Sequence, residues 1–205
     1  MIKAIIFDMD GVLIDAKDWH YEALNKALGF FGEEISRYDH LVTFDGLPTH
    51  KKLEMLSNTG ELPVGLHSLI NDLKQKFTLE MVYARCKPHF YHQYALSKLK
   101  SEGYKLVVCS NSIRRTIEIM MERSDLLKYL DFFLSNQDVV RSKPDPEIYQ
   151  KAIERLNMKP QECLILEDNE VGIKAAIAIK AHLLKVNKLE DVNYLNIKKK
   201  IRELS

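Results

Sequence analysis

Two carboxylates, Asp8 and Asp10, follow directly after the first apolar run of the chain, residues 2–7. The run does not alternate strictly, which predicts a strand that is buried on both faces. Ligands bind outside the carboxyl ends of the strands in an open parallel sheet, so these acids lie where chemistry would take place. Two acids this close repel each other unless a cation or a shared proton relieves them. A pair of solvated turn acids is the alternative interpretation.

Further polar side chains follow later apolar runs. Ser110 and Asn111 come after the run at 105–109, and Glu167 and Asp168 come after the run at 163–166. Lys143 stands in a loop before a predicted helix. Solvated turns alone do not account well for so many polar groups at strand ends, which favours a shared site.

The elements that would position these groups alternate along most of the chain. Apolar runs predict strands at 2–7, 105–109, 132–134, 163–166 and 182–186, with amphipathic helical patterns between them. This order predicts an α/β fold with a doubly wound parallel sheet. Residues 15–87 carry only helical patterns, so we expect a core domain of 1–14 and 88–205 and a helical cap domain of 15–87 inserted after the first strand. Thr49 is the expected N-cap of a short cap helix.

Composition limits the classes of partner. The chain has 205 residues, 46% of them hydrophobic, with 30 Lys and Arg against 29 Asp and Glu. This near-neutral balance gives no reason to expect nucleic acid or a membrane surface as partner. The three cysteines are far apart, and no leader or apolar span is visible, which predicts reduced thiols in a cytoplasmic protein. We expect a monomer, with an oligomer left open.

The residue types suit phosphoryl transfer. Clustered carboxylate oxygens suit Mg²⁺, while a hydroxyl, backbone N–H groups and a lysine suit the oxygens of a phosphoryl group. A carboxylate can attack phosphorus to give an aspartyl-phosphate, and a second carboxyl can protonate the leaving oxygen. We therefore assign Asp8 as nucleophile and Asp10 as acid and base. Ser110, Asn111 and Lys143 are the expected ligands of the substrate phosphoryl group.

Four motifs together resemble those of the haloacid dehalogenase (HAD) superfamily, in the same order and across nearly the whole chain. The matching segments are Asp8-Met9-Asp10-Gly11-Val12, Ser110-Asn111, Lys143-Pro144-Asp145-Pro146 and Glu167-Asp168-Asn169. The helical insertion resembles the cap of its β-phosphoglucomutase-like and phosphoglycolate-phosphatase-like branch. The resemblance implies a HAD-like Rossmannoid core and a Mg²⁺ site formed by Asp8, the backbone carbonyl of Asp10, Asp168 and Glu167. It also implies that Ser110 and Lys143 hold the phosphoryl group.

Two cap residues are expected to bind substrate, His20 and Thr49. In the β-phosphoglucomutase-like members, a histidine at the place of His20 couples cap closure to acid–base work; a hinge or packing role is the alternative. Thr49 stands where the mutase arginine grips a second phosphate. His50, Lys51 or Lys52 nearby could compensate, although we expect the two lysines on a helix face in water.

The departure at Thr49 favours a phosphatase over a mutase. We expect a Mg²⁺-dependent phosphatase whose partner is a small phosphorylated metabolite, with sugar phosphates among the expected substrates. The first alternative is a β-phosphoglucomutase-like mutase. The second is a phosphoaspartate switch without turnover, which lacks such a cap in its usual form.

Overall fold

The computed structural model describes residues 1–60 and 62–204 and divides into two compact units. The core unit combines Met1–Asp15 with Lys87–Ser205, and the helical unit is Ala16–Cys86. The chain passes from one to the other between Asp15 and Ala16 and returns between Cys86 and Lys87. The role of the helical unit as a substrate cap stays a prediction.

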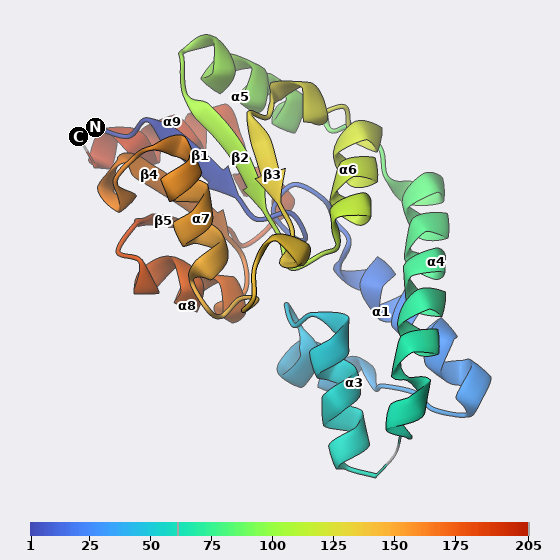
Figure 1. Ribbon diagram of the computed structural model, residues 1–205. Helices are drawn as coiled ribbons and strands as arrows, with labels where there is room; N and C mark the ends of the chain where they lie inside the picture. Colours follow the sequence, from blue (N-terminus) through green and yellow to red (C-terminus); the bar gives the residue numbers. More distant parts are fainter. Residues whose placement is uncertain (61, 205) are drawn as a thin grey trace. The chain divides into compact units, whose positions relative to one another are not determined.

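The core unit contains one parallel sheet with the strand order β3-β2-β1-β4-β5 (Figure 1). The strands are β1 Ala4–Phe7, β2 Lys105–Cys109, β3 Phe132–Leu134, β4 Cys163–Glu167 and β5 His182–Lys185. The first strand of the chain thus lies in the middle, with β2 and β4 on either side. The prediction of a doubly wound parallel α/β fold is confirmed.

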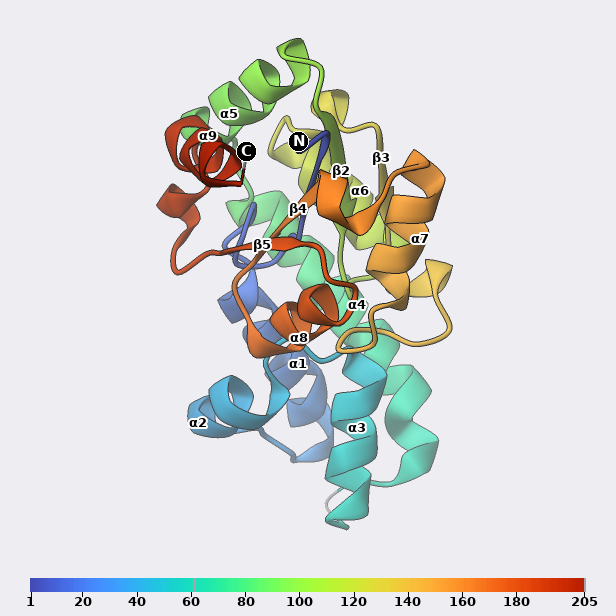
Figure 2. The ribbon, with the colours of Figure 1, turned by 90° about the vertical axis from the view of Figure 1, so that its left-hand side faces the viewer.

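Helices cover both faces of this sheet. They are α5 Phe90–Ser101, α6 Arg114–Arg123, α7 Glu147–Leu156, α8 Glu170–Ala178 and α9 Tyr194–Glu203. Single turns of 3₁₀ helix lie between them at Leu127–Tyr129, Asn136–Asp138, Pro160–Glu162 and Leu189–Asp191. Figure 2 shows α5 and α9 on one side of the sheet and α7 on the other. Because both faces are covered, every residue of β1 and β4 is buried.

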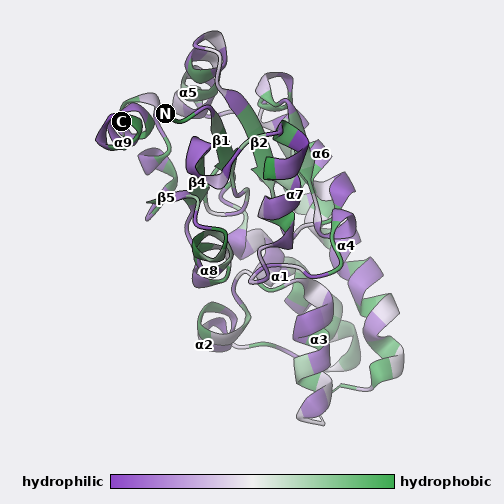
Figure 3. Ribbon diagram, turned by 60° about the vertical axis from the view of Figure 1, so that its left-hand side comes forward, coloured by the Kyte–Doolittle hydropathy of each residue, from purple (hydrophilic) through white to green (hydrophobic). Residues whose placement is uncertain are grey.

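Alternate strand residues form the core on the face of α7 and α8. Ile6 and Ile165 pack there in one cluster with Tyr149 of α7 and Ala176 of α8. Ile5, between Ala4 and Ile6, points to the opposite face, since successive strand residues alternate. Each fully buried aliphatic side chain stabilises the fold by about 1.5–3 kcal/mol. The hydrophobic colouring of β1 and β2 in Figure 3 follows this double burial.

The helical unit contains α1 Lys17–Leu28, α2 Arg37–Asp39, α3 Thr49–Asn58 and α4 His67–Arg85. A π-helical turn spans His40–Phe44, and 3₁₀ turns span Gly29–Phe31 and Val64–Leu66. Helices α1 and α4 pack on each other, and their amphipathic faces close an apolar cluster that includes Leu24, Leu28 and Ile70. At the edge of that contact, Arg85 donates to both oxygens of Glu22, at 2.8 and 2.7 Å.

Three details of the helical unit differ from the sequence predictions. Helix α3 begins at Thr49 with Pro48 as its N-cap, so Thr49 is the first helical residue rather than the cap. Proline suits this boundary because its ring disfavours a helical conformation of the preceding residue. Lys51 is exposed as expected, whereas Lys52 is only 7% exposed. The turns between Arg37 and Phe44 had no counterpart among the predicted elements.

The cysteines Cys86, Cys109 and Cys163 are free and buried, in agreement with the expected reduced thiols. Within residues 1–60 and 62–204, every helix is too short or too polar to cross a lipid bilayer.

Candidate active site

The strand register brings the predicted acids together at the carboxyl edge of the sheet. Phe7 pairs with Val108 of β2 and with Leu166 of β4, so Asp8 stands level with the ends of both neighbours. The backbone N–H of Asp8 donates to the carbonyl of Leu166 at 3.0 Å, which extends the ladder by one residue. Asp8 is 5% exposed and Glu167 is fully buried. The two carboxylates are therefore held by backbone geometry before any ligand is considered.

Lys143 joins the ends of three strands. Its ammonium donates to Asp8 Oδ1 at 2.7 Å, to Glu167 Oε1 at 2.6 Å and to the carbonyl of Cys109 at 2.8 Å. These are all three of its donor directions, and the residue is 3% exposed. Lys143 thus belongs to the site even though its loop starts far from the other motifs in sequence.

Asn111 fixes the backbone of Lys143. Its amide nitrogen donates to the Lys143 carbonyl at 3.3 Å, and its amide oxygen accepts from the Lys143 N–H at 3.1 Å. This two-point contact orients the loop that carries the lysine. The expected contact of Asn111 with substrate stays a prediction beside this structural role.

Ser110 and Asp10 are linked through Ser112, a residue that sequence reasoning missed. The buried Ser110 hydroxyl accepts from the N–H of Ser112 at 3.1 Å, and the Ser112 hydroxyl donates to Asp10 Oδ2 at 3.1 Å. Its position two residues after the motif residue Ser110 was the one sign in the sequence that Ser112 could lie near the site. Gly11 turns the chain after Asp10 with φ 87°, a left-handed conformation that favours glycine.

Three carboxylates could hold a cation. Asp8, Glu167 and Asp168 each offer an oxygen, and these oxygens lie within 4.8 Å of one another. Within the described part of the chain, the buried Glu167 Oε2 has no hydrogen-bond partner. A buried acceptor of this kind is costly unless it is satisfied, and an all-oxygen set suits a hard cation such as Mg²⁺. The donor set therefore fits the expected metal, with Asp10 contributing no side-chain oxygen to the cluster.

The electrostatics of the site agree with a demand for positive charge. Burial raises the pKa of Asp8 well above its ordinary value, and the nearby Glu167 charge raises it further, while Lys143 opposes both. Burial also raises the pKa of Glu167 against the effect of Lys143. For Lys143, burial alone would lower the pKa, but Asp8 and Glu167 outweigh it and raise the pKa. One lysine balances only part of the negative charge gathered here.

Two further residues that sequence reasoning missed surround Glu167. The Tyr149 hydroxyl donates to Glu167 Oε1, and Lys143 Nζ lies 4.8 Å from the centre of the Tyr149 ring. Gly172, in the first turn of α8, faces the Glu167 carboxylate so closely that a Cβ would overlap it. Tyr149 looks like an ordinary member of an apolar helix face in the sequence, and only the packing of α7 on the sheet shows its contact.

His20 and Thr49 lie in the helical unit. His20 Nδ1 is 3.3 Å from the Nζ of the buried Lys74, and Thr49 opens α3 half-buried. His40, in the π-helical turn, is 2% exposed and packs against the ring of Tyr21 at 4.8 Å. The expected contacts of His20 and Thr49 with substrate stay predictions.

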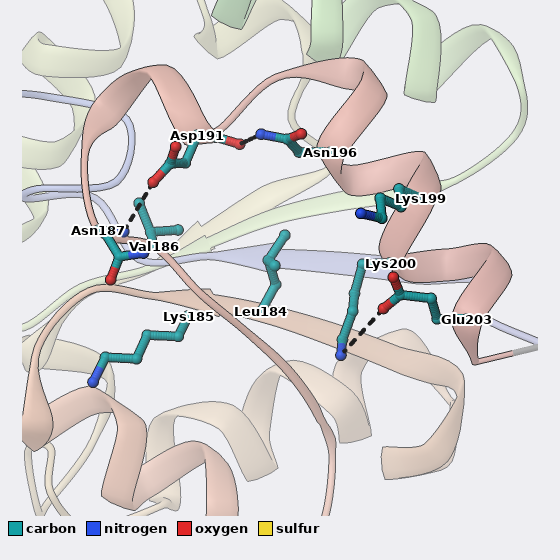
Figure 4. Close-up of a pocket in the computed structure, with 9 residues that line it drawn as sticks. All are labelled: Leu184, Lys185, Val186, Asn187, Asp191, Asn196, Lys199, Lys200 and Glu203. Carbon is teal, nitrogen blue, oxygen red and sulfur yellow. Dashed lines mark hydrogen bonds and ion pairs between the residues drawn. The ribbon is translucent and has the colours of Figure 1, made fainter.

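A pocket of about 320 Å³ lies elsewhere in the core unit, between β5 and α9 (Figure 4). It is lined by Leu184, Lys185, Val186, Asn187, Asp191, Asn196, Lys199, Lys200 and Glu203, none of which was a predicted site residue. Asp191 accepts the N–H of Asn187 at 3.2 Å, and Lys200 pairs with Glu203 at 3.8 Å. Lys200 and Glu203 thus balance each other within the wall of this pocket.

The sheet topology and the acid–lysine cluster at its carboxyl edge define an α/β enzyme whose site suits phosphate esters. The chain belongs to the haloacid dehalogenase-like hydrolase family, whose model matches residues 5–186. The resemblance seen in the motifs is confirmed.

Several relatives of the chain have names of phosphatases. A phosphorylated carbohydrates phosphatase of Thermotoga maritima is 30% identical over 178 residues, which are 85% of this chain and 80% of that protein. The pyrophosphatase PpaX of Bacillus cereus is 28% identical over 181 residues, 84% of this chain and 77% of that protein. Among solved structures, β-phosphoglucomutase from Clostridium difficile matches with a TM-score of 0.86 at 22% identity, covering 99% of this chain and 98% of that one. That likeness shows the shared fold.

Proposed function

We propose that this enzyme is a Mg²⁺-dependent phosphatase that hydrolyses small phosphorylated metabolites, sugar phosphates among them, through an aspartyl-phosphate. The observation that carries the proposal is the buried ammonium of Lys143 between Asp8 Oδ1 and Glu167 Oε1, at 2.7 and 2.6 Å. It supports a site in which positive charge is held beside the Asp8 carboxylate, where the oxygens of a phosphoryl group would need it. Phosphoryl transfer depends strongly on this kind of positioning and charge balance.

In the first step, Asp8 attacks phosphorus while the bond from phosphorus to the substrate oxygen breaks. Asp10 gives its proton to that oxygen, and the alcohol leaves. In the second step, Asp10 takes a proton from water, the water oxygen attacks phosphorus, and the acyl phosphate bond breaks. Inorganic phosphate leaves, and Asp8 is restored as a carboxylate.

The remaining site residues bind and orient. Ser110 would bind a phosphoryl oxygen, Lys143 would supply a positive charge beside the phosphoryl group, and Asn111 keeps Lys143 in place through its backbone. The Ser112 hydroxyl, 3.1 Å from Asp10 Oδ2, orients the acid. Asp8, the Asp10 carbonyl, Glu167 and Asp168 would hold Mg²⁺, which would neutralise charge on the phosphoryl oxygens.

One observation supports the proposed substrate class, and another supports hydrolysis as the reaction. A relative is named a phosphorylated carbohydrates phosphatase and is 30% identical over most of both chains. Thr49 lacks the charge that a mutase needs for a second phosphate, which supports hydrolysis over isomerisation. We propose that the helical unit acts as the cap, with His20 and Thr49 contacting substrate, and that closure excludes bulk water from the site.

Phosphate release from a panel of sugar phosphates, nucleotides and phosphoglycolate, with and without Mg²⁺, tests the proposal. Asp8→Asn removes the nucleophile and should abolish release, whereas Asp72→Asn changes an exposed acid on α4 and should leave the rate unchanged. Full activity of Asp8→Asn would contradict the covalent mechanism. Isomerised product that depends on a bisphosphate would indicate the mutase, and a lasting phosphoaspartate without turnover would indicate the switch.

A further inference from the structure

Tyr149 is a fully buried residue on α7 that the proposed chemistry does not use. Its hydroxyl donates to Glu167 Oε1, the same oxygen that accepts from Lys143 Nζ. The face of its ring lies under the Lys143 ammonium, at 4.8 Å from the ring centre. One side chain therefore contacts both buried charges of the site, the acid through its hydroxyl and the cation through its ring.

The two oxygens of Glu167 differ in their hydrogen bonding. Oε1 accepts from Tyr149 and Lys143, while Oε2 has no hydrogen-bond partner within the described residues. The backbone of Gly172 closes the side toward α8, since even a methyl group there would overlap the carboxylate. The carboxylate is thus held at Oε1 and confined by Gly172, while the buried Oε2 has no hydrogen-bond partner among the described residues.

Packing alone does not require the hydroxyl. A phenylalanine would fill the same volume and keep the ring under Lys143, and a phenol is buried at a cost unless its O–H finds a partner. The partner that this O–H finds is an acid of the candidate metal cluster. Groups that hydrogen-bond a metal-binding carboxylate orient it and commonly change metal affinity when they are removed.

We propose that Tyr149 is a positioning residue that holds the Glu167 carboxylate in the orientation required for divalent cation binding. The proposal rests on the Mg²⁺ site of the proposed function, but cation binding can be measured without turnover. It predicts a division of labour at Glu167, with Oε1 held by the protein and Oε2 directed to the cation or to water bound to it.

The test compares Tyr149→Phe with wild type in a titration with Mn²⁺ alone. The EPR signal of the free ion reports how much Mn²⁺ stays unbound. We expect the dissociation constant for Mn²⁺ to rise about tenfold, in line with the loss of an outer-shell hydrogen bond. In the phosphatase assay, the Mg²⁺ concentration for half-maximal rate should rise in parallel, while kcat at saturating Mg²⁺ returns to near the wild-type value. Tyr94→Phe, which removes the same atom from a half-exposed tyrosine on α5, should change neither quantity.

Two outcomes would overturn the proposal. An unchanged Mn²⁺ dissociation constant in a folded Tyr149→Phe protein would limit Tyr149 to packing, with any effect confined to the melting temperature. A loss of kcat that saturating Mg²⁺ does not recover would place the hydroxyl in the chemical step instead. If wild type binds Mn²⁺ and Tyr149→Phe weakens it, but no phosphate ester is hydrolysed, the proposed function fails while the role of Tyr149 stands.

Discussion

Asp8 and Lys143 form a buried ion pair of 2.7 Å although 135 positions separate them in the sequence. Both side chains are almost fully shielded from water, at 7% and 3% exposure. Such a pair contributes little net stability compared with apolar packing, but removal of one partner leaves an uncompensated buried charge.

Lys143→Met is therefore expected to abolish phosphatase activity and to lower the free energy of unfolding by about 3–5 kcal/mol. The reason is that Asp8 and Glu167 then face each other without a cation. The double variant Asp8→Asn with Lys143→Met should recover part of that stability because it removes one of the two charges. Urea unfolding measures both values, and a double variant less stable than Lys143→Met would contradict the electrostatic explanation.

Gly172→Ala tests how tightly the Glu167 carboxylate is confined. Alanine favours a helix by about 1 kcal/mol over glycine, yet here its Cβ would overlap a carboxylate that Lys143 and Tyr149 hold in place. We expect a net loss of about 1–3 kcal/mol, the usual cost of overpacking. Thermal and urea unfolding measure the change.

The matched control for that variant is Gly65→Ala, because a Cβ there meets nothing within 4 Å. It should leave the melting temperature nearly unchanged. Adding Glu167→Asp to Gly172→Ala shortens the carboxylate and should restore part of the stability. A Gly172→Ala protein as stable as wild type would show that Glu167 moves aside without cost.

Stability should fall as the pH falls from 6.5 toward 4. Burial lowers the pKa of His40 from its ordinary 6.5 to about 4, with the Lys52 charge adding to the effect, and burial likewise lowers the pKa of His92 to about 4. Between pH 6.5 and pH 4, these two histidines bind protons in the unfolded chain but stay largely neutral in the folded protein. The stabilisation is complete above pH 6.5 and is lost toward pH 4, with a slope of up to about 1.4 kcal/mol per pH unit for each histidine.

Urea midpoints at pH 7.5 and pH 5 measure this dependence. Carboxylates also lose charge in acid, so the informative quantity is the difference between wild type and His40→Phe or His92→Phe, each of which should flatten the pH profile. Profiles that remain identical in both phenylalanine variants would assign the acid sensitivity to other groups.

Much of the fold could be predicted because its strands are short apolar runs that end in polar residues. The predicted strands at 105–109 and 132–134 have those bounds in the structure. Motif acids such as Asp8 and Glu167 were found because they follow such runs directly. The order of the strands could not be predicted, since periodicity records which residues are buried but not which strands are neighbours.

The residues that were missed depend on packing between elements. Tyr149 has the pattern of a core helix residue, and its contact with Glu167 exists only because α7 lies on β4 in one register. Lys52 was expected in water because lysine rarely is buried, yet it is 7% exposed. A sequence pattern reports the average behaviour of a residue type, whereas these side chains serve a local demand for charge or for a hydrogen bond.

The central place of β1 also determines when the sheet can form during synthesis. Ala4 pairs with Lys105 on one side and with Cys163 on the other, so β1 leaves the ribosome long before either neighbour exists. The contacts between α1 and α4, in contrast, close within Ala16–Cys86. Helical packing of low contact order forms quickly, while an apolar strand with two open edges is prone to association. The apolar strand β1 of the nascent chain therefore stays unpaired on at least one edge until β4 has been translated. Chaperone binding during translation is expected to concentrate at β1.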